Sequence, residues 1–221
     1  MRFACFISII AISPMGAAEP DTSTPVATIR SYLAATKAND IETAKKCWTI
    51  DDENASGALD VVVGMGISSR KLVAATRDKI GADGVKALGR WDRPNCSDRA
   101  IDLTLTRIAA TEVKERGEIA RVTIHWESGD GEETPAFLFV KAPIILRKLG
   151  DSWKLDANVA TATDKAAEMF GPNKIWPIWR DEMAAMDELT GLLDQGTIEG
   201  VAAFEKALKS KVAALKAKYE K

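Results

Sequence analysis

The sequence predicts an α+β fold in which N-terminal helices pack on an antiparallel sheet of about four strands, followed by a C-terminal αα-hairpin. Apolar residues first recur at helical spacing, then alternate with polar residues between residues 101 and 155, and recur at helical spacing again beyond residue 161. Apolar residues make up 46% of the 221-residue chain, which is enough for a substantial core and too many for a disordered chain.

The first 18 residues have the order of a secretory signal peptide. Arg2 supplies a positive start, residues 3–12 are largely apolar, Pro14 breaks a helix, and small residues fill positions 16–18, where a signal peptidase cleaves. The apolar run is about half of what a membrane-spanning helix needs. We therefore expect a mature chain that begins near Glu19 and is exported, to a periplasm or to the extracellular space.

The expected domain organisation is a signal peptide over 1–18, an α+β domain over 19–160 and a helical extension over 161–221. The 30 basic and 32 acidic side chains give a net charge of −2, which gives no reason to expect a nucleic acid partner. No second apolar stretch approaches membrane length, so we expect no integral membrane segment in the mature chain. We expect no cofactor and no metal, because the lone histidine, His125, has no ligands at metal-binding spacing.

Two helix starts are marked by local capping signals. Thr24 is a hydroxyl cap followed by Pro25 at the first helical position, and this helix should stop near Asn39. Asp40 is a fresh cap for a short second helix over 41–48, which ends at about Trp48.

A third helix is expected from Ala58 to about Ile80. Gly64 and Gly66 interrupt its apolar pattern and predict a kink or a break there. A further short helix is expected after Gly84.

Half-buried strands are indicated where apolar and polar residues alternate. One further segment, 136–141, is apolar on both faces, as in an inner strand. The last two strands form a closing hairpin with Gly150 in its turn. The expected strands span residues 101–105, 120–126, 136–141, 144–149 and 152–155.

The C-terminal segment carries two apolar stripes at helical spacing, separated by Gly196, with Thr197 as the cap of the second helix. This αα-hairpin cannot bury its stripe alone, so it must pack on the sheet domain or on another subunit. The stripes consist of Trp176, Trp179, Met183, Met186 and Leu193, then Val201, Phe204, Leu208, Val212, Leu215 and Tyr219.

Two cysteines, Cys47 and Cys96, remain after the signal peptide. In an exported protein such a pair indicates a disulfide, and the alternative is two separately buried thiols. Either arrangement is structural rather than catalytic, because a nucleophilic cysteine needs a nearby histidine.

Two sequence segments resemble the NTF2-like superfamily, the cystatin-like α+β cone fold. Tyr32-Leu33 and the following residues 37–44 (KANDIETA) are similar to its opening helices, where a helix typically ends in a step of Gly or Asn, Asp, an aromatic or apolar residue, Glu, any residue and Ala. Residues 147–156 (RKLGDSWKLD) are similar to its final hairpin, where a glycine turn precedes a Trp-Lys-apolar strand. The chain thus resembles an exported bacterial member over residues 24–159, with a C-terminal helical extension outside the resemblance.

The resemblance implies a curved sheet wrapped around helices into a cone with an apolar pocket. Tyr32, Trp48 and Trp126 are the candidate pocket residues, and a core role is the alternative for each. Isomerase-like members pair a tyrosine of the first helix with an inward carboxylate. Here the available acids are Asp102, whose alternation points it away from the core, and Asp60.

The superfamily uses this cone for enzymes such as ketosteroid isomerase and polyketide cyclases, and also for binding and dimerisation, so the fold does not settle the function. The sequence shows no catalytic constellation, so we do not expect an enzyme. The preferred hypothesis is an exported non-catalytic module that binds a small apolar ligand or a protein partner. The alternatives are an isomerase- or cyclase-like enzyme and a structural module that forms a homodimer.

Overall fold

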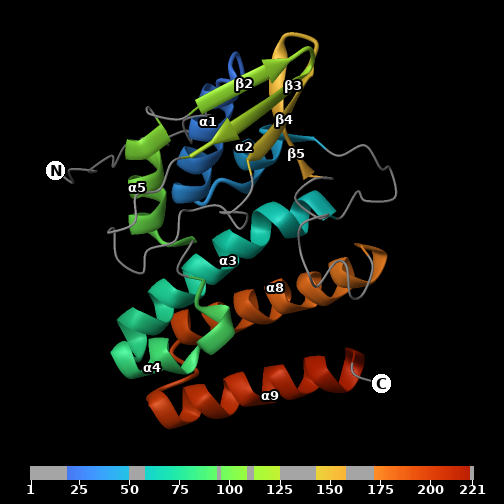
Figure 1. Cartoon of the computed structure of the whole chain (residues 1–221). Helices are drawn as coiled ribbons and strands as arrows, with labels where there is room; N and C mark the ends of the chain where they lie inside the picture. Colours follow the sequence, from blue (N-terminus) through green and yellow to red (C-terminus); the bar gives the residue numbers. More distant parts are fainter. Residues whose placement is uncertain are drawn as a thin grey trace, which may run out of the picture.

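The structure is a computed structural model that describes residues 19–49, 58–93, 96–108, 112–124, 143–157 and 172–219. It is a mixed α+β fold with a five-stranded open sheet at one end and a layer of long helices at the other (Figure 1). The expected signal peptide and the expected strand 136–141 lie outside the described residues, as do His125 and Trp126.

The sheet contains β1 (Trp48–Thr49), β2 (Glu112–Arg116), β3 (Ile119–Thr123), β4 (Ile144–Leu149) and β5 (Ser152–Asp156). Its strand order is β1-β5-β4-β3-β2. The four longer strands pair antiparallel, as predicted, whereas β1 pairs with β5 in parallel and makes the sheet mixed. The predicted hairpin of β4 and β5 is confirmed, and Gly150 takes a φ of 61° in its turn.

The helices of the described chain are α1 (Pro25–Lys37), α2 (Ile41–Lys46), α3 (Ala58–Lys79), α4 (Ala82–Ala87), the 3₁₀ helix η2 (Gly89–Trp91), α5 (Asp98–Arg107), α8 (Pro172–Asp194) and α9 (Val201–Tyr219). α1 packs on β3 and β5, α3 packs on α1 and α2, and α8 packs on α3. α9 turns back along α8 and also contacts α4 (Figure 1). α3 is therefore the element that joins the sheet end to the helical layer.

The capping signals before α1 and α2 are confirmed. Thr24 Oγ1 accepts a hydrogen bond from the Ala27 amide at 3.1 Å, and Asp40 Oδ1 accepts one from the Thr43 amide at 3.0 Å. Asn39 ends α1 with a φ of 59°, the left-handed conformation that asparagine tolerates better than most residues. The predicted extent of the second helix is wrong, because α2 ends at Lys46 and Trp48 belongs to β1.

The predicted break at Gly64 and Gly66 is wrong, because α3 is one helix of 22 residues. The glycines allow close packing instead. A Cβ atom at Gly64 would lie 2.5 Å from Met183 Sδ of α8, and one at Gly66 would lie 3.1 Å from Cys96 Sγ. The helix propensity lost at glycine, about 1 kcal/mol each, is outweighed by the tertiary contact that the missing side chains permit.

Replacing Gly64 with valine is expected to lower the free energy of unfolding by about 1–3 kcal/mol, because a stiff β-branched side chain would push α3 away from Met183. Gly64→Ala is the matched control. The Met183 side chain is flexible and alanine favours a helix, so this change should stay within about 1 kcal/mol. Urea unfolding measures both, and a valine variant as stable as the alanine variant would contradict the close packing.

The predicted strand at 101–105 is wrong, because these residues lie in the helix α5. Ser97 Oγ caps this helix by accepting a hydrogen bond from the Ala100 amide at 3.2 Å. Ile101, Thr104 and Ile108 are buried, and their spacing of three and four residues is helical. Residues 101–108 therefore fit two patterns, an alternation typical of a strand and a spacing of three and four residues typical of a helix, and the helix forms.

The other helix starts differ slightly from prediction. α4 begins at Ala82, ahead of Gly84. α8 stops as expected before Gly196, whose φ of 67° allows its amide to bond to the Leu193 carbonyl at 3.0 Å. α9 begins at Val201 instead of directly after Thr197.

A clasp at Asp181 holds the end of α9 against α8. Asp181 Oδ2 accepts a hydrogen bond from the Tyr219 hydroxyl at 2.6 Å and another from Lys218 Nζ. The pKa of Asp181 is lowered from its ordinary value, first by the Lys218 hydrogen bond and then by that of Tyr219. A carboxyl with a lower pKa in the folded chain adds stability above its unfolded pKa and loses it as the pH falls through the folded value.

Asp181→Asn is therefore expected to lower stability at pH 7 by about 1 kcal/mol or less, because the clasp is partly solvated. The difference from the unmodified protein should shrink as the pH falls below about 4, the ordinary pKa of an aspartate, and disappear below the lowered pKa of the folded carboxyl. Denaturant unfolding at both pH values measures this. Asp187→Asn, at an exposed position of the same helix, is the control. A stability difference between Asp181→Asn and the unmodified protein that stays constant with pH would contradict these hydrogen bonds.

Candidate functional site

Two of the three candidate pocket residues lie together. The rings of Tyr32, in α1, and Trp48, in β1, meet edge to face with centroids 5.4 Å apart and an angle of 83°. Trp48 is 8% exposed and Tyr32 is half-buried. The third candidate, Trp126, lies outside the described residues.

The Trp48 indole Nε1 is buried and has no hydrogen-bond partner in the described part of the chain. A buried donor left unsatisfied costs about 1–3 kcal/mol. A ligand that carried an acceptor atom to this donor would remove that cost. The indole N–H therefore marks a place where a bound molecule would be stabilised.

The Tyr32 hydroxyl remains a neutral phenol at physiological pH. Burial raises the pKa of Tyr32 well above its ordinary value, and the proximity of Cys96 and Cys47 adds to the shift. Tyr32 can thus donate a hydrogen bond to an oxygen atom without carrying a charge of its own.

The two cysteines are free and buried, so the structure has the second of the two arrangements considered above. Cys47 lies at the end of α2, and burial raises the pKa of its thiol to about 11. Cys96 packs against Gly66 of α3, and burial raises the pKa of its thiol as well. Both groups are protonated near neutral pH and are poor nucleophiles, because the thiolate is the reactive form.

The two candidate acids of an isomerase-like site form surface ion pairs. Asp102 projects from α5 with its side chain 55% exposed, and its Oδ1 lies 2.5 Å from Lys37 Nζ. Asp60, at the start of α3, pairs with Lys45 and is 50% exposed. Within the described residues, no group of three His, Cys, Asp or Glu side chains could hold a metal ion.

A groove of about 1350 Å³ follows α3 between the end of α1, the start of α5 and the second half of α8. Small residues and charged residues of both signs line it. The small residues include Ser68, Ala74, Ala75 and Gly191, the basic residues are Lys37, Arg70, Lys71, Arg77, Arg93 and Arg99, and the acidic residues are Asp78, Asp92, Asp98, Asp187 and Asp194.

Arg70 fixes the wall of this groove, and sequence reasoning missed it. Its guanidinium donates to the Lys37 carbonyl at 3.1 Å and to the Thr36 carbonyl, and it pairs with Asp98 at the start of α5. One side chain therefore bonds to two carbonyls at the end of α1, of which that of Thr36 also accepts from the Asn39 amide at 3.1 Å, and ties three helices together. These partners lie 28 to 34 residues away in the sequence, so no local pattern indicates them.

Glu182 is a second residue that the sequence did not indicate. This side chain of α8 is 8% exposed, and its carboxylate lies 2.5 Å from Arg90 Nη2 and 3.9 Å from Arg93 Nη2. The pairing holds η2 and the following residues on α8, and Arg93 also lines the groove.

No family model, curated protein or solved structure matches the chain. Among the helices that the structure describes, none is long and apolar enough to cross a membrane.

Proposed function

We propose that the protein is an exported, non-catalytic binding module of the NTF2-like type, and that its ligand is a small apolar molecule with one hydrogen-bond acceptor. The observation that carries this is the buried, unpartnered Trp48 N–H beside the phenol of Tyr32. Two aromatic rings offer apolar contact, and the neutral Trp48 N–H would orient one acceptor, which is the usual composition of a small-molecule site.

The surroundings of Tyr32 favour binding over catalysis. An isomerase-like reaction needs a carboxylate that can shuttle a proton near the phenol. Asp60 and Asp102, the acids considered for this role, pair with lysines at the surface. The high pKa of Tyr32 suits a hydrogen-bond donor and disfavours proton release.

The finer fold that we propose is a cone formed by the sheet and α1 and α2, with α8 and α9 as an αα-hairpin extension. In support, α1 packs on the inner sides of β3 and β5, and Thr28 Oγ1 donates to the Trp153 carbonyl at 3.1 Å. The α8–α9 contact and the turn at Gly196 support the hairpin.

Native mass spectrometry of protein purified from an oxidising compartment tests the function. We expect an adduct that leaves on activation, and we expect Trp48→Phe to reduce its occupancy about 10-fold, because a hydrogen bond to a buried group is lost. Trp179→Phe, on α8, is the matched control. A bare mass for the unmodified protein, or equal loss in both variants, would overturn the proposal.

The same variant makes a separate prediction about stability. Without ligand, Trp48→Phe should leave the free energy of unfolding unchanged or raise it by about 1 kcal/mol, because it removes a buried donor that has no partner. Thermal or urea unfolding of ligand-free protein checks this. A loss of more than about 2 kcal/mol would mean that the indole N–H is already satisfied in the folded protein.

A protein partner is the second candidate, and the groove along α3 favours it. Its 1350 Å³ volume exceeds what a small ligand needs, and its charged walls suit a peptide segment better than an apolar compound. A photo-crosslinking residue at Ala74, which lines the groove, should then capture one protein species in cells. The same residue at Ala203, exposed on α9, is the control, and equal capture at both positions would count against the groove.

A further inference from the structure

The outer face of the sheet carries a ladder of basic side chains. The strand register places Arg116, Ile119, Arg147 and Lys154 in one row across β2, β3, β4 and β5, and Lys114 beside Arg121 in the next row. This face is opposite to the buried Ala120, Val122, Leu146 and Leu155. We call the five cations Lys114, Arg116, Arg121, Arg147 and Lys154 the outer ladder.

Acidic side chains offset the outer ladder only in part. Within the described strands, Asp156 and Glu112 are the acids on this face, and they pair with Arg147 at 2.7 Å and Lys114 at 2.9 Å. Arg116 and Arg121 are exposed and form no ion pair within the described chain. The strand face therefore carries five cations against two carboxylates, although the whole chain has a net charge of −2. The adjoining β2–β3 and β4–β5 turns add one exposed acid each, Glu118 and Asp151, so the positive charge is concentrated on the strands.

Exposed aliphatic side chains lie in the same sheet. The three large hydrophobic residues that are exposed in the described chain are Val113, Ile119 and Leu149, at 36%, 46% and 50%. Ile119 and Leu149 share the face of the outer ladder, next to the β2–β3 and β4–β5 turns. The β2–β3 turn is joined to the end of β4, because the Lys148 amide donates to the Glu118 carbonyl at 2.8 Å.

We propose that this face binds the surface of a bilayer of anionic phospholipid. Lys and Arg side chains near such a surface are attracted to its headgroups, and Ile119 and Leu149 would insert between them. This site is separate from Tyr32 and Trp48, so the inference goes beyond the proposed function. The protein would be a peripheral binder, held by charge and by a small apolar tip.

Other occupants fit the face less well. A second copy docked on it by two-fold symmetry would bring one outer ladder against another, with like charges opposed. Single-stranded nucleic acid needs aromatic stacking platforms, and no aromatic side chain lies on this face of the described strands. Protein interfaces are anchored by aromatic residues and methionine, which the face also lacks within the described strands.

Vesicle sedimentation tests the proposal with the purified protein. We expect binding to vesicles of phosphatidylglycerol and phosphatidylcholine in equal parts, loss of binding at high salt, and no binding to phosphatidylcholine alone. The double variant Arg116→Glu and Arg121→Glu should lower the partition coefficient at least about 10-fold. The variant Ile119→Ser and Leu149→Ser should weaken binding while keeping its salt dependence.

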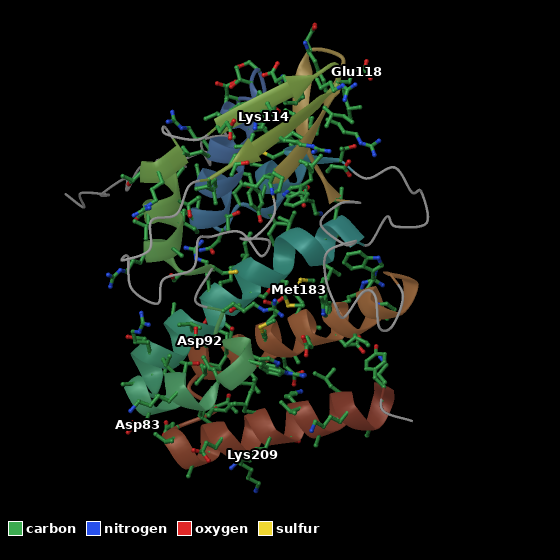
Figure 2. The ribbon with its side chains drawn as sticks, in the orientation of Figure 1. Asp83, Asp92, Lys114, Glu118, Met183 and Lys209 are labelled. Atoms are coloured by element: carbon green, nitrogen blue, oxygen red, sulfur yellow. The ribbon has the colours of Figure 1, made fainter. Side chains whose placement is uncertain are left out.

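The matched control places the same charge change elsewhere. Figure 2 shows Lys114 at the sheet end of the molecule and Lys209 of α9 at the opposite end. Lys206→Glu with Lys216→Glu, on exposed positions of α9, should therefore leave vesicle binding unchanged. Circular dichroism confirms that each variant is folded before it is compared.

Three results would overturn the proposal. They are absence of binding to phosphatidylglycerol vesicles, equal loss in the α9 control, and binding of an acidic polypeptide such as polyglutamate without binding of vesicles. The last would assign the face to acidic proteins instead of membranes. None of these results depends on the Trp48 site.

Discussion

Replacing Phe204 with alanine is expected to lower the free energy of unfolding by about 3–5 kcal/mol. Phe204 is fully buried in α9, which packs on α4 and α8. Deleting the ring removes its transfer free energy and leaves a cavity that neighbouring helices fill only in part. Equilibrium unfolding in urea measures the loss as a lower midpoint.

Lys206→Ala, two residues away on the exposed side of α9, is the matched control and should change stability by less than about 0.5 kcal/mol. Unfolding at two protein concentrations separates packing within one chain from packing between subunits. A Phe204→Ala effect below about 1 kcal/mol would show that α9 is not part of the core. A midpoint that rises with concentration would show that α9 packs on a second copy.

The expected result would settle an alternative that the sequence left open, namely whether the C-terminal helices pack on their own chain. In the structure α8 covers α3, with Met186, Leu189 and Leu193 fully buried, and α9 covers α8 and α4. The amphipathic stripes of these helices were readable from spacing alone. The element that covers these stripes could not be predicted, because a stripe indicates that a helix face is buried and does not identify the element that buries it.

Local signals predicted the parts of the fold that depend on near neighbours. Thr24, Asp40 and Gly196 act on groups within a few residues, so their caps and turns were readable directly. The alternation that predicted β3 is also a local signal. The same holds for the hairpin of β4 and β5, because a short turn joins its two strands.

The failures involve contacts between distant residues. Trp48 continues a helical pattern, yet its backbone pairs with Leu155, more than a hundred residues away, in the parallel strand β1. Gly64 weakens a helix locally, yet Met183 of α8 fills the space that it leaves. In both cases a tertiary contact overrides the local preference.

The sequence indicated some residues of the candidate site and missed others, as it did for the fold. Tyr32 and Trp48 were singled out by residue type and by the resemblance, and the structure brings them together. Arg70 and Glu182 were missed, because their partners are backbone carbonyls and charges on other elements. An arginine on a helix ordinarily faces solvent, so only the folded structure reveals that Arg70 joins α3 to α1 and α5.

Replacing Arg70 with alanine is expected to lower the free energy of unfolding by about 2–4 kcal/mol. The side chain is 12% exposed and bonds to two carbonyls at the end of α1 and to Asp98. Asp98 is 63% exposed, so its ion pair should contribute less than about 1 kcal/mol. The main loss therefore comes from the two charge-assisted hydrogen bonds to the Thr36 and Lys37 carbonyls, of which, within the described chain, only that of Thr36 keeps a backbone donor, the Asn39 amide.

A double-mutant cycle between Arg70→Ala and Asp98→Ala separates these two contributions, with urea unfolding as the measurement. We expect a coupling energy below about 1 kcal/mol and a much larger loss for Arg70→Ala alone. Lys71→Ala, the exposed neighbour on α3, is the matched control. Arg70→Lys should recover only part of the loss, because an ammonium cannot reproduce the planar fork that reaches both carbonyls and Asp98. A fully stable lysine variant would mean that charge alone, and not the capping of α1, holds this wall of the groove.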